Sequence, residues 1–347
     1  MENRIIQNHG LLEGVQIFAG VIASILTFVG LIANLLMIIA LLKSKKLSHL
    51  VMTKFIVSLA VSDLLFCSIN VGSNAVRYIT RNNPESADSI WGAKVCEVFT
   101  FFYFANGGVS LANLFLITLN QYVMICHYDK LEKIYRMRNV YLMIAFVWIQ
   151  TYILSALPLF KIWGEIVPAR KKYSCTIEEN ENGNPKMFFL VFAFGCPFTV
   201  IIYCYISMYR KIKQTRKALA DTMTLQYFQK KKEKEREQDW RMVKMMLLVF
   251  GCFIFTFLPS VIINKFDEDS NYPNVHVFMD ILWWLASVIN PFIYMIKNKQ
   301  YRDAVGQIIH GMVCMPERYI DPYTKWHNSN SAENSANSNL VSKPQKV

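Results

Sequence analysis

The sequence predicts an all-α membrane protein, a bundle of seven transmembrane helices followed by a short amphipathic eighth helix. Of the 347 residues, 53% are hydrophobic and only 18% are charged, against roughly 25% charged in ordinary soluble domains. The apolar residues gather in seven stretches, each long enough to cross a bilayer, which takes about 20 residues of helix. Short polar connectors separate the stretches. This pattern favours a membrane bundle over the alternative, buried helices of a large soluble protein.

We expect the spans at positions 15–42, 50–76, 93–126, 139–160, 187–209, 242–263 and 275–296. The first span includes Asn34, the second includes Asp63, and the third runs from near Cys96 to a polar triplet at 120–122. The remaining four spans each contain a proline: Pro158, Pro197, Pro259 and Pro291. Proline removes a backbone donor and bends a helix. Membrane helices tolerate such breaks where neighbours or water satisfy the freed groups.

The basic residues predict the orientation of the chain. Lys and Arg gather in the first, third and fifth connectors, where the fifth includes QKKKEKEREQDWR, and again just after the seventh span. Because short cytoplasmic loops are enriched in Lys and Arg, we expect an extracellular N-terminus and a cytoplasmic C-terminus in the plasma membrane. The net charge of +12 then lies largely on the cytoplasmic side. Anionic membrane lipids, and no nucleic acid, are its expected partners.

Four regions follow from this reading. We expect an extracellular N-terminus at 1–14, the helical bundle at 15–296, an amphipathic helix at 297–314 and a disordered cytoplasmic tail at 315–347. The stretch KNKQYRDAVGQIIHGMVC has the pattern of a helix that lies on the inner membrane surface. The tail is rich in Ser and Asn and poor in apolar residues. Its serines are candidates for phosphorylation and for recruiting an arrestin-like partner, and an unmodified solubilising tail is the alternative.

Short motifs inside the spans recur in a fixed order. They are GLIANLL, SLAVSDLL, NQY, FAFGCPF, FGCFIFTFLP and NPFIY, in the first, second, third, fifth, sixth and seventh spans. Together and in this order they resemble the rhodopsin-like (class A) G-protein-coupled receptors over about residues 30–301. Within that family, the stretch LITLNQYVMICHY is most similar to the insect moody and trapped-in-endoderm receptors.

The resemblance implies a cell-surface receptor that transmits the binding of an extracellular ligand to cytoplasmic heterotrimeric G proteins. An atypical non-coupling or arrestin-biased receptor is one alternative, and a membrane transporter is another. Transporters often contain internal repeats with broken helices, and no repeat relates the two halves of this chain. The sequence also lacks a Ser/His/Asp set, a zinc motif and a phosphate-binding loop, so we expect no enzyme.

The family resemblance implies a small polar pocket that binds a sodium ion in the middle of the membrane. A carboxylate at this depth is costly and needs partners, and Asp63 is the carboxylate here. One carboxylate among neutral oxygen donors suits a hard cation. The other expected members are Asn34, Ser110, Ser287 and Asn290. The alternative is a hydrogen-bonded network without an ion, and we expect no other cofactor.

Cys96 and Cys175 are the two cysteines expected outside the membrane. That side is oxidising, and the family carries a disulfide at this place, so we expect a bond that pins the second outer loop to the third span. Cys314 follows the amphipathic stretch. It is a candidate palmitoylation site, with a free thiol as the alternative.

The ligand pocket implied by the resemblance is aromatic and uncharged. Tyr103 stands where amine receptors carry an Asp, which argues against an amine ligand. Trp284 stands where visual pigments carry the lysine that binds retinal, which argues against an opsin. The expected wall is Phe102, Tyr103, Asn106, Phe189, Phe257, Trp283 and Trp284. Such a wall suits a lipid or another lipophilic small molecule.

The family's activation machinery has one clear departure in this chain. Asn120, Gln121 and Tyr122 replace the usual Asp-Arg-Tyr at the cytoplasmic end of the third span. Gln121 is uncharged, so we expect a hydrogen bond to Asp239 in the resting state in place of an ion pair. The other positions implied to act in activation are Tyr205, Phe253, Pro259, Asn290, Pro291 and Tyr294. Among these, Pro259 is the expected pivot of the sixth span.

Overall fold

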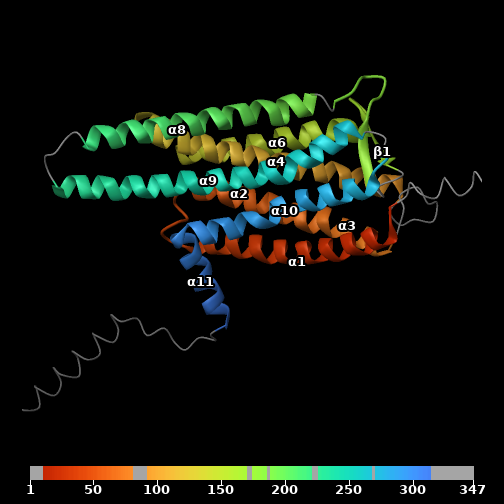
Figure 1. Ribbon diagram of the computed structural model, residues 1–347, viewed down its shortest axis with the longest axis horizontal. Helices are drawn as coiled ribbons and strands as arrows, with labels where there is room; N and C mark the ends of the chain where they lie inside the picture. The colour runs from red at the N-terminus through yellow and green to blue at the C-terminus, as the bar shows by residue number, and fades with distance from the viewer. Residues whose placement is uncertain are drawn as a thin grey trace, which may run out of the picture. The chain divides into compact units, whose positions relative to one another are not determined.

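The computed structural model describes residues 11–80, 92–169, 174–185, 188–220, 226–267 and 270–313. Met1–Val305 forms one compact unit, a bundle of long helices (Figure 1), and Gly306–Val347 forms another. The first span is α1 (Glu13–Lys43). The second is one continuous helix made of α2 (Val51–Leu65), the π-helical turn η3 (Phe66–Val71) and α3 (Gly72–Thr80). The third is α4 (Ala93–Cys126), which η4 (Tyr128–Lys130) and the short α5 (Leu131–Ile134) follow.

The second half of the bundle begins with α6 (Met137–Leu159), the fourth span. The fifth consists of the π-helical η5 (Phe189–Gly195) and α8 (Cys196–Ala220). The sixth lies in α9 (Gln226–Phe266) and the seventh in α10 (Pro273–Lys297), and α11 (Lys299–Val313) comes last. The strands β1 (Glu165–Ala169) and β2 (Ser174–Glu178) form an antiparallel hairpin between α6 and η5.

Six helices in the described part of the chain are long and apolar enough to cross a membrane: Glu13–Lys43, Val51–Thr80, Lys94–Cys126, Met137–Leu159, Val243–Phe266 and Pro273–Lys297. The expected fifth span is also helical, but it is divided between η5 and α8, and α8 continues into the basic sequence RKIKQTRK. Pro197 at the start of α8 accounts for the division. It has no N–H to donate, and its ring crowds the carbonyl one turn earlier, which widens the helix there.

The helices pack in a ring in which α4 has the most neighbours. It contacts α2, α6 and α8, whereas α1 lies against α2, α3 and α10, and α9 packs along α10. Gly30 permits the close approach of α1. A Cβ at this position would collide with Cys67 of η3 and lie 3.1 Å from a methyl group of Val288 in α10.

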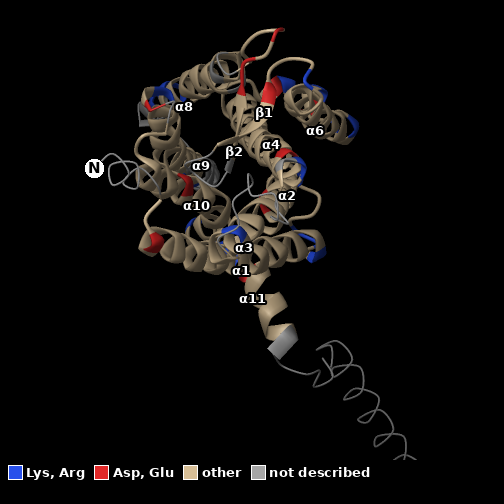
Figure 2. Cartoon of the chain, turned by 90° about the vertical axis from the view of Figure 1, so that its right-hand side faces the viewer, with Lys and Arg blue, Asp and Glu red and all other residues tan. Residues whose placement is uncertain are grey.

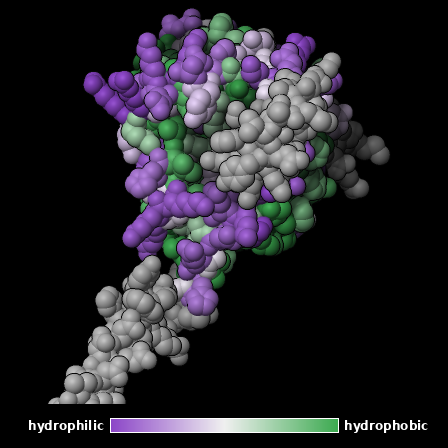
Figure 3. Space-filling model, turned by 90° about the vertical axis from the view of Figure 1, so that its left-hand side faces the viewer, coloured by the Kyte–Doolittle hydropathy of each residue, from purple (hydrophilic) through white to green (hydrophobic). Residues whose placement is uncertain are grey.

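The outward faces of the bundle are apolar, as expected for helices that face lipid. Phe28 of α1, Phe146 of α6 and Phe255 of α9 are all more than 60% exposed. Seen end-on from the hairpin side, most of the ribbon belongs to uncharged residues, and Lys, Arg, Asp and Glu are a minority (Figure 2). Hydrophilic residues gather on the surface seen from the opposite end (Figure 3). This distribution agrees with a bundle that crosses a bilayer.

Candidate functional site

A disulfide fixes the hairpin at the outer end of the bundle. Cys96 in the first turn of α4 is bonded to Cys175 of β2, and their Cα atoms lie 5.9 Å apart. Cys175 pairs with Pro168 across the hairpin. Both strands are therefore held over the end of α4, and the predicted disulfide is confirmed. Cys314, the predicted palmitoylation site, lies outside the described residues.

The expected polar network forms around Asp63, which is 1% exposed. The hydroxyl of Ser110 in α4 donates to Asp63 Oδ1 at 2.8 Å, and the amide of Asn290 in α10 donates to Oδ2 at 2.8 Å. Asn34 of α1 donates to the backbone carbonyl of Ser287 at 3.0 Å. These bonds tie four helices together in the interior of the membrane-spanning part, where an unpaired polar group costs several kcal/mol.

The oxygen atoms of this network are of the kinds that can act as ligands of a sodium ion. Asp63 supplies one carboxylate, Ser110 supplies a hydroxyl, and the Oδ1 atom of Asn34 is a buried acceptor that has no hydrogen-bond partner. Oxygen ligands with a single negative charge suit a hard monovalent cation better than a transition metal. Within the described ranges no three His, Cys, Asp or Glu residues cluster to hold a metal. A cation here would rely on hydroxyl and amide oxygens beside the one carboxylate.

A continuous series of aromatic contacts runs through the bundle from the middle of α4 to the inner part of α8. The ring of Tyr103 lies 5.0 Å from that of Trp283, and Trp283 lies 4.6 Å from Phe257. Phe257 stacks on Phe253 at 5.4 Å. The series continues through Phe198, Phe250 and Tyr205, with ring distances of 6.2, 5.4 and 6.0 Å between neighbours. We call these seven residues the aromatic ladder.

Four of the seven expected pocket-wall residues lie together. Tyr103, Trp283 and Phe257 are joined in the aromatic ladder. Trp284 is buried in a cluster with Tyr78 of α3, to which its ring lies 6.3 Å away, and Tyr103 and Trp283 pack against this cluster.

The remaining three wall residues face other elements. Phe102 packs against Tyr152 of α6, and Asn106 accepts a hydrogen bond from the Tyr152 hydroxyl at 2.7 Å. Phe189 lies beside Trp163, just before the hairpin.

The triplet near the end of α4 is uncharged, and its first two members are buried. Asn120 is 4% and Gln121 is 1% exposed. The amide nitrogen of Gln121 donates to the sulfur of Met52 in α2 at 2.9 Å, and its Oε1 atom is buried without a hydrogen-bond partner. The hydroxyl of Tyr122 lies 3.2 Å from Nε2 of His127. Asp239 belongs to α9, but its side chain lies outside the described part, so its pairing with Gln121 stays a prediction.

The two tyrosines expected to act in activation lie on different helices and contact different neighbours. Tyr205 of α8 packs on Phe250 of α9, whereas Tyr294 of α10 packs on Tyr301 of α11 with a ring distance of 6.2 Å. The Tyr294 hydroxyl is buried and has no hydrogen-bond partner. Pro259 and Pro291 both lie inside their helices, where each removes one backbone hydrogen bond.

At their outer ends, α9 and α10 are joined by a compact turn. The carboxylate of Asp267 accepts hydrogen bonds from the backbone N–H groups of Asn271 and Tyr272, at 2.8 and 2.9 Å, and lies 3.0 Å from His276. Burial opposes its charge, but the hydrogen bonds from Tyr272, Asn271 and His276 outweigh burial and hold the pKa of Asp267 below its usual value. The turn therefore binds the two helices to each other.

Sequence reasoning missed two members of the ladder, Phe198 and Phe250, and also missed Phe194, whose ring stacks on Phe257 at 4.3 Å. A search for phenylalanines at helical spacing would have identified them. Phe194 and Phe198 are four residues apart, and Phe250, Phe253 and Phe257 follow at spacings of three and four, so each set lies on one helix face.

Comparison with known proteins gives one family. The model of the 7 transmembrane receptor (rhodopsin family) matches residues 33–294, which is most of the chain and includes all the long helices in whole or in part.

Relatives agree with this match. The chain is 31% identical over 308 residues to the protein trapped in endoderm-1 of Drosophila melanogaster, covering 84% of this chain and 77% of that protein. It is 27% identical over 381 residues to the G-protein coupled receptor moody of the same species, covering 93% of this chain but only 55% of moody. The crystal structure of squid rhodopsin superposes with a TM-score of 0.73 at 18% identity, covering 89% of this chain and 90% of that one.

Proposed function

We propose that this chain, which belongs to the 7 transmembrane receptor (rhodopsin) family, is a cell-surface receptor that passes the binding of an extracellular ligand to heterotrimeric G proteins in the cytoplasm. The family consists of receptors and not of enzymes. In our proposal the N-terminus is extracellular and the C-terminus is cytoplasmic, as the basic connectors predict.

The observation that carries the proposal is the aromatic ladder. It connects Tyr103, in the expected ligand region, to Tyr205, toward the cytoplasmic end of α8, without a gap larger than an ordinary ring contact. Four of its seven members lie on α9 and α10, and Phe257 lies two residues before Pro259. A ligand that displaces Trp283 or Phe257 would therefore repack α9 at the point where the helix lacks a hydrogen bond.

The surroundings of Tyr103 support a lipophilic or small non-amine ligand. Its ring lies between Phe66 at 5.3 Å and Trp283 at 5.0 Å. Position 103 itself supplies no carboxylate to a ligand ammonium group, and the nearby Asp280 of α10 shares its surroundings with Arg77. Apolar contact with these rings is the main source of affinity in such a site.

We further propose that the Asp63 network binds sodium in the resting receptor. The network joins α1, α2, α4 and α10, so an ion bound there would stabilise the helices in their present arrangement. Rearrangement of α10 at Pro291 would alter the ligand set, because Asn290 precedes that proline and bonds to Asp63. Sodium would then favour the inactive state by binding it more tightly.

One observation favours a second candidate function, a non-coupling or arrestin-biased receptor. Gln121 is directed to Met52 of α2 and not to a charged partner. Gln is shorter than Arg and lacks its planar array of donors, so the contact with a G protein would be weaker. In our main proposal coupling persists, with Tyr205 and Tyr294 carrying more of the active-state contact.

The test of the main proposal is nucleotide exchange by purified G proteins on the full-length chain in lipid nanodiscs. The wild type should catalyse exchange on at least one Gα class. Phe257→Ala breaks the ladder between Trp283 and Phe253. Since an aromatic pair is worth about 0.5–1.5 kcal/mol, it should change basal exchange by about two- to tenfold.

The matched control is Phe255→Ala, two residues away on α9 and 69% exposed. It should leave exchange near the wild-type value. Arrestin binding without exchange on any Gα class would favour the second candidate. Solute flux through the membrane without exchange would point to a transporter.

A further inference from the structure

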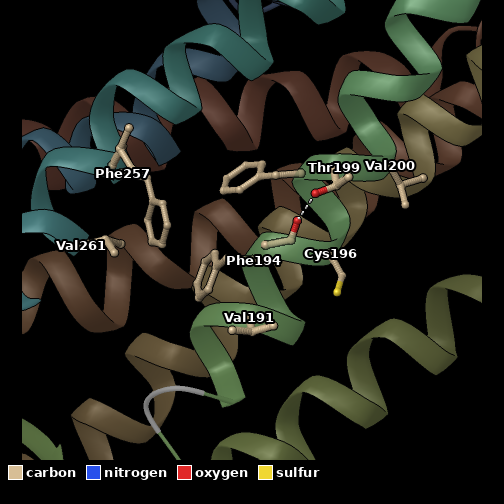
Figure 4. Close-up of a pocket in the computed structure, with 10 residues that line it drawn as sticks. Val191, Phe194, Cys196, Thr199, Val200, Phe257 and Val261 are labelled. Carbon is tan, nitrogen blue, oxygen red and sulfur yellow. Dashed lines mark hydrogen bonds between the residues drawn. The ribbon is translucent and has the colours of Figure 1, made fainter.

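A cavity of about 610 Å³ separates the fifth span from the sixth. Its lining comes from η5, from the start of α8 and from α9, and includes Phe194, Phe198, Phe257 and Val261. In Figure 4 the side chains of Phe194, Phe257 and Val261 project into the space between the two helices. The volume falls within the roughly 300–1,000 Å³ of small-molecule sites.

The local sequence explains why the cavity forms between these helices. α9 packs closely along α10 but touches α8 only sparingly. The π-helical η5 ends at Gly195 and Pro197 follows, so the backbone is widened where it faces α9. Gly195, which has no side chain, is itself part of the lining. Side chains therefore do not fill the gap.

The cavity opens toward the bilayer. Val191, Val200 and Leu258 belong to its lining and are 45%, 38% and 47% exposed on the outer face of the bundle. These residues lie within the expected fifth and sixth spans, where the surrounding medium is hydrocarbon. A lipid tail thus has direct access, whereas a solute from water has to cross the membrane interface first.

The lining offers nothing to a polar ligand. It includes one hydroxyl, that of Thr199, which already donates to the backbone carbonyl of Gly195 at 2.9 Å (Figure 4). The thiol of Cys196 is the only other polar side-chain group, and no charged residue takes part. Polar ligands would lose hydrogen bonds on entry without replacement. Hydrocarbon loses none.

We propose that this cavity is a second ligand site, entered sideways from the membrane, which takes the acyl chain of a bilayer lipid. Its inner wall is the stacked pair Phe194–Phe257, whose rings lie 4.3 Å apart at an interplanar angle of 21°. Phe257 is also a member of the aromatic ladder. An acyl chain that presses on this pair acts on the ladder at Phe257, through Phe194 and not through Trp283. This effect on signalling rests on the proposed receptor function, whereas binding of the acyl chain does not.

Binding is tested by photo-crosslinking of the full chain in nanodiscs that contain phosphatidylcholine with a diazirine in its acyl chain. Wild-type protein should be labelled preferentially on peptides that include residues 191–200 and 257–261. Val261→Trp places an indole in the cavity and should reduce that labelling several-fold. Ile262→Trp is the matched control, because Ile262 is the next residue on α9, is 47% exposed and does not line the cavity.

Equal labelling in both variants would overturn the proposal, since it would report general lipid exposure of α9. A second outcome would also overturn the proposal. If labelling is lost in discs that hold two copies of the receptor but is present in discs that hold one, the occupant of the cavity is a second copy of the chain.

Nucleotide exchange measured on the same discs separates the two proposals. If the wild type catalyses exchange but is labelled unselectively, the proposed acyl-chain site is refuted and the proposed receptor function is supported. If labelling is selective but no Gα class undergoes exchange, the acyl-chain site is supported and the proposed coupling to G proteins is refuted. If both hold, Val261→Trp should change basal exchange and Ile262→Trp should not.

Discussion

Asp63 and Phe257 lie in two halves of one bundle that are assembled in different ways. Around Asp63, directional hydrogen bonds of 2.8–3.0 Å join α1, α2, α4 and α10, and Gly30 brings α1 against its neighbours. Around Phe257, ring contacts connect α9 to η5 and α8, and beside them lies a cavity of about 610 Å³. Hydrogen bonds between buried groups fix geometry and are costly to break. Ring contacts can shift by small amounts with little loss.

From this difference we infer where the bundle can move. α9 is joined to α10 by the Asp267 turn but meets α8 through aromatic side chains and a cavity. We therefore expect a change of state to have its boundary between α8 and α9, with Pro259 as the expected point of bending. In this proposal α1, α2 and α4 form the fixed half, whereas α10, which contributes Asn290 to the network, can move relative to them at Pro291.

The largest effect is expected where the fixed half is closely packed. Gly30→Ala places a Cβ against Cys67 and Val288, and overpacking of this kind costs about 1–3 kcal/mol. Gly251→Ala on α9 is the matched change, because a Cβ there meets nothing within 4 Å, and it should stabilise the helix by about 0.5–1 kcal/mol. Thermal unfolding of the detergent-solubilised receptor measures both. Equal shifts for the two variants would remove the distinction between the halves.

A smaller effect is expected from the proposed ion. Sodium chloride should raise the unfolding midpoint of the wild type relative to choline chloride. When the sodium concentration is ten times the dissociation constant of the site, binding raises the free energy of unfolding by about 1.4 kcal/mol. Asp63→Asn removes the carboxylate that a hard cation requires and should abolish the difference between the salts. Thr118→Ala, a buried hydroxyl of α4 bonded to Leu114, should keep it. A wild type that responds identically to both salts would leave only a hydrogen-bonded network.

The smallest effect is expected at the cytoplasmic end. Gln121→Arg restores a charge that can pair with an acidic residue at rest and reach the G protein in the active state. In the active state the Arg would gain one contact with the G protein at the membrane surface, worth about 0–1 kcal/mol, so stimulated nucleotide exchange should rise by at most about fivefold. Gln121→Met, uncharged and of similar length, should not raise exchange. If Gln121→Arg leaves exchange unchanged or abolishes it, then Gln121 does not weaken coupling to the G protein.

Much of the bundle could be predicted from the sequence, because the length and hydropathy of a stretch identify a membrane helix. The Cys96–Cys175 bond is predicted chiefly by the family resemblance, and the expected position of both cysteines on the oxidising side agrees with it. The meeting of Asp63 and Asn290 is likewise implied by the resemblance, and the need of a carboxylate in hydrocarbon for partners supports it.

The rest depends on helix rotation, which an all-apolar span does not reveal. Phe102 and Asn106 face Tyr152 of α6, and no periodicity in the third span indicates that direction. The π-helical turn at Phe66–Val71 contains no proline to mark it. The contact of Gln121 with Met52 joins two residues that belong to different helices and carry no complementary charges, so neither residue identifies the other.

The neutral triplet has one more consequence. Neither Asn120 nor Gln121 gains or loses a proton at any physiological pH, and a contact between an amide and a thioether carries no net charge for dissolved ions to screen. Receptors with a carboxylate and a guanidinium at these positions expose their resting contact to both influences. In this chain the corresponding contact should hold with the same strength through cytosolic acidification and through changes in ionic strength.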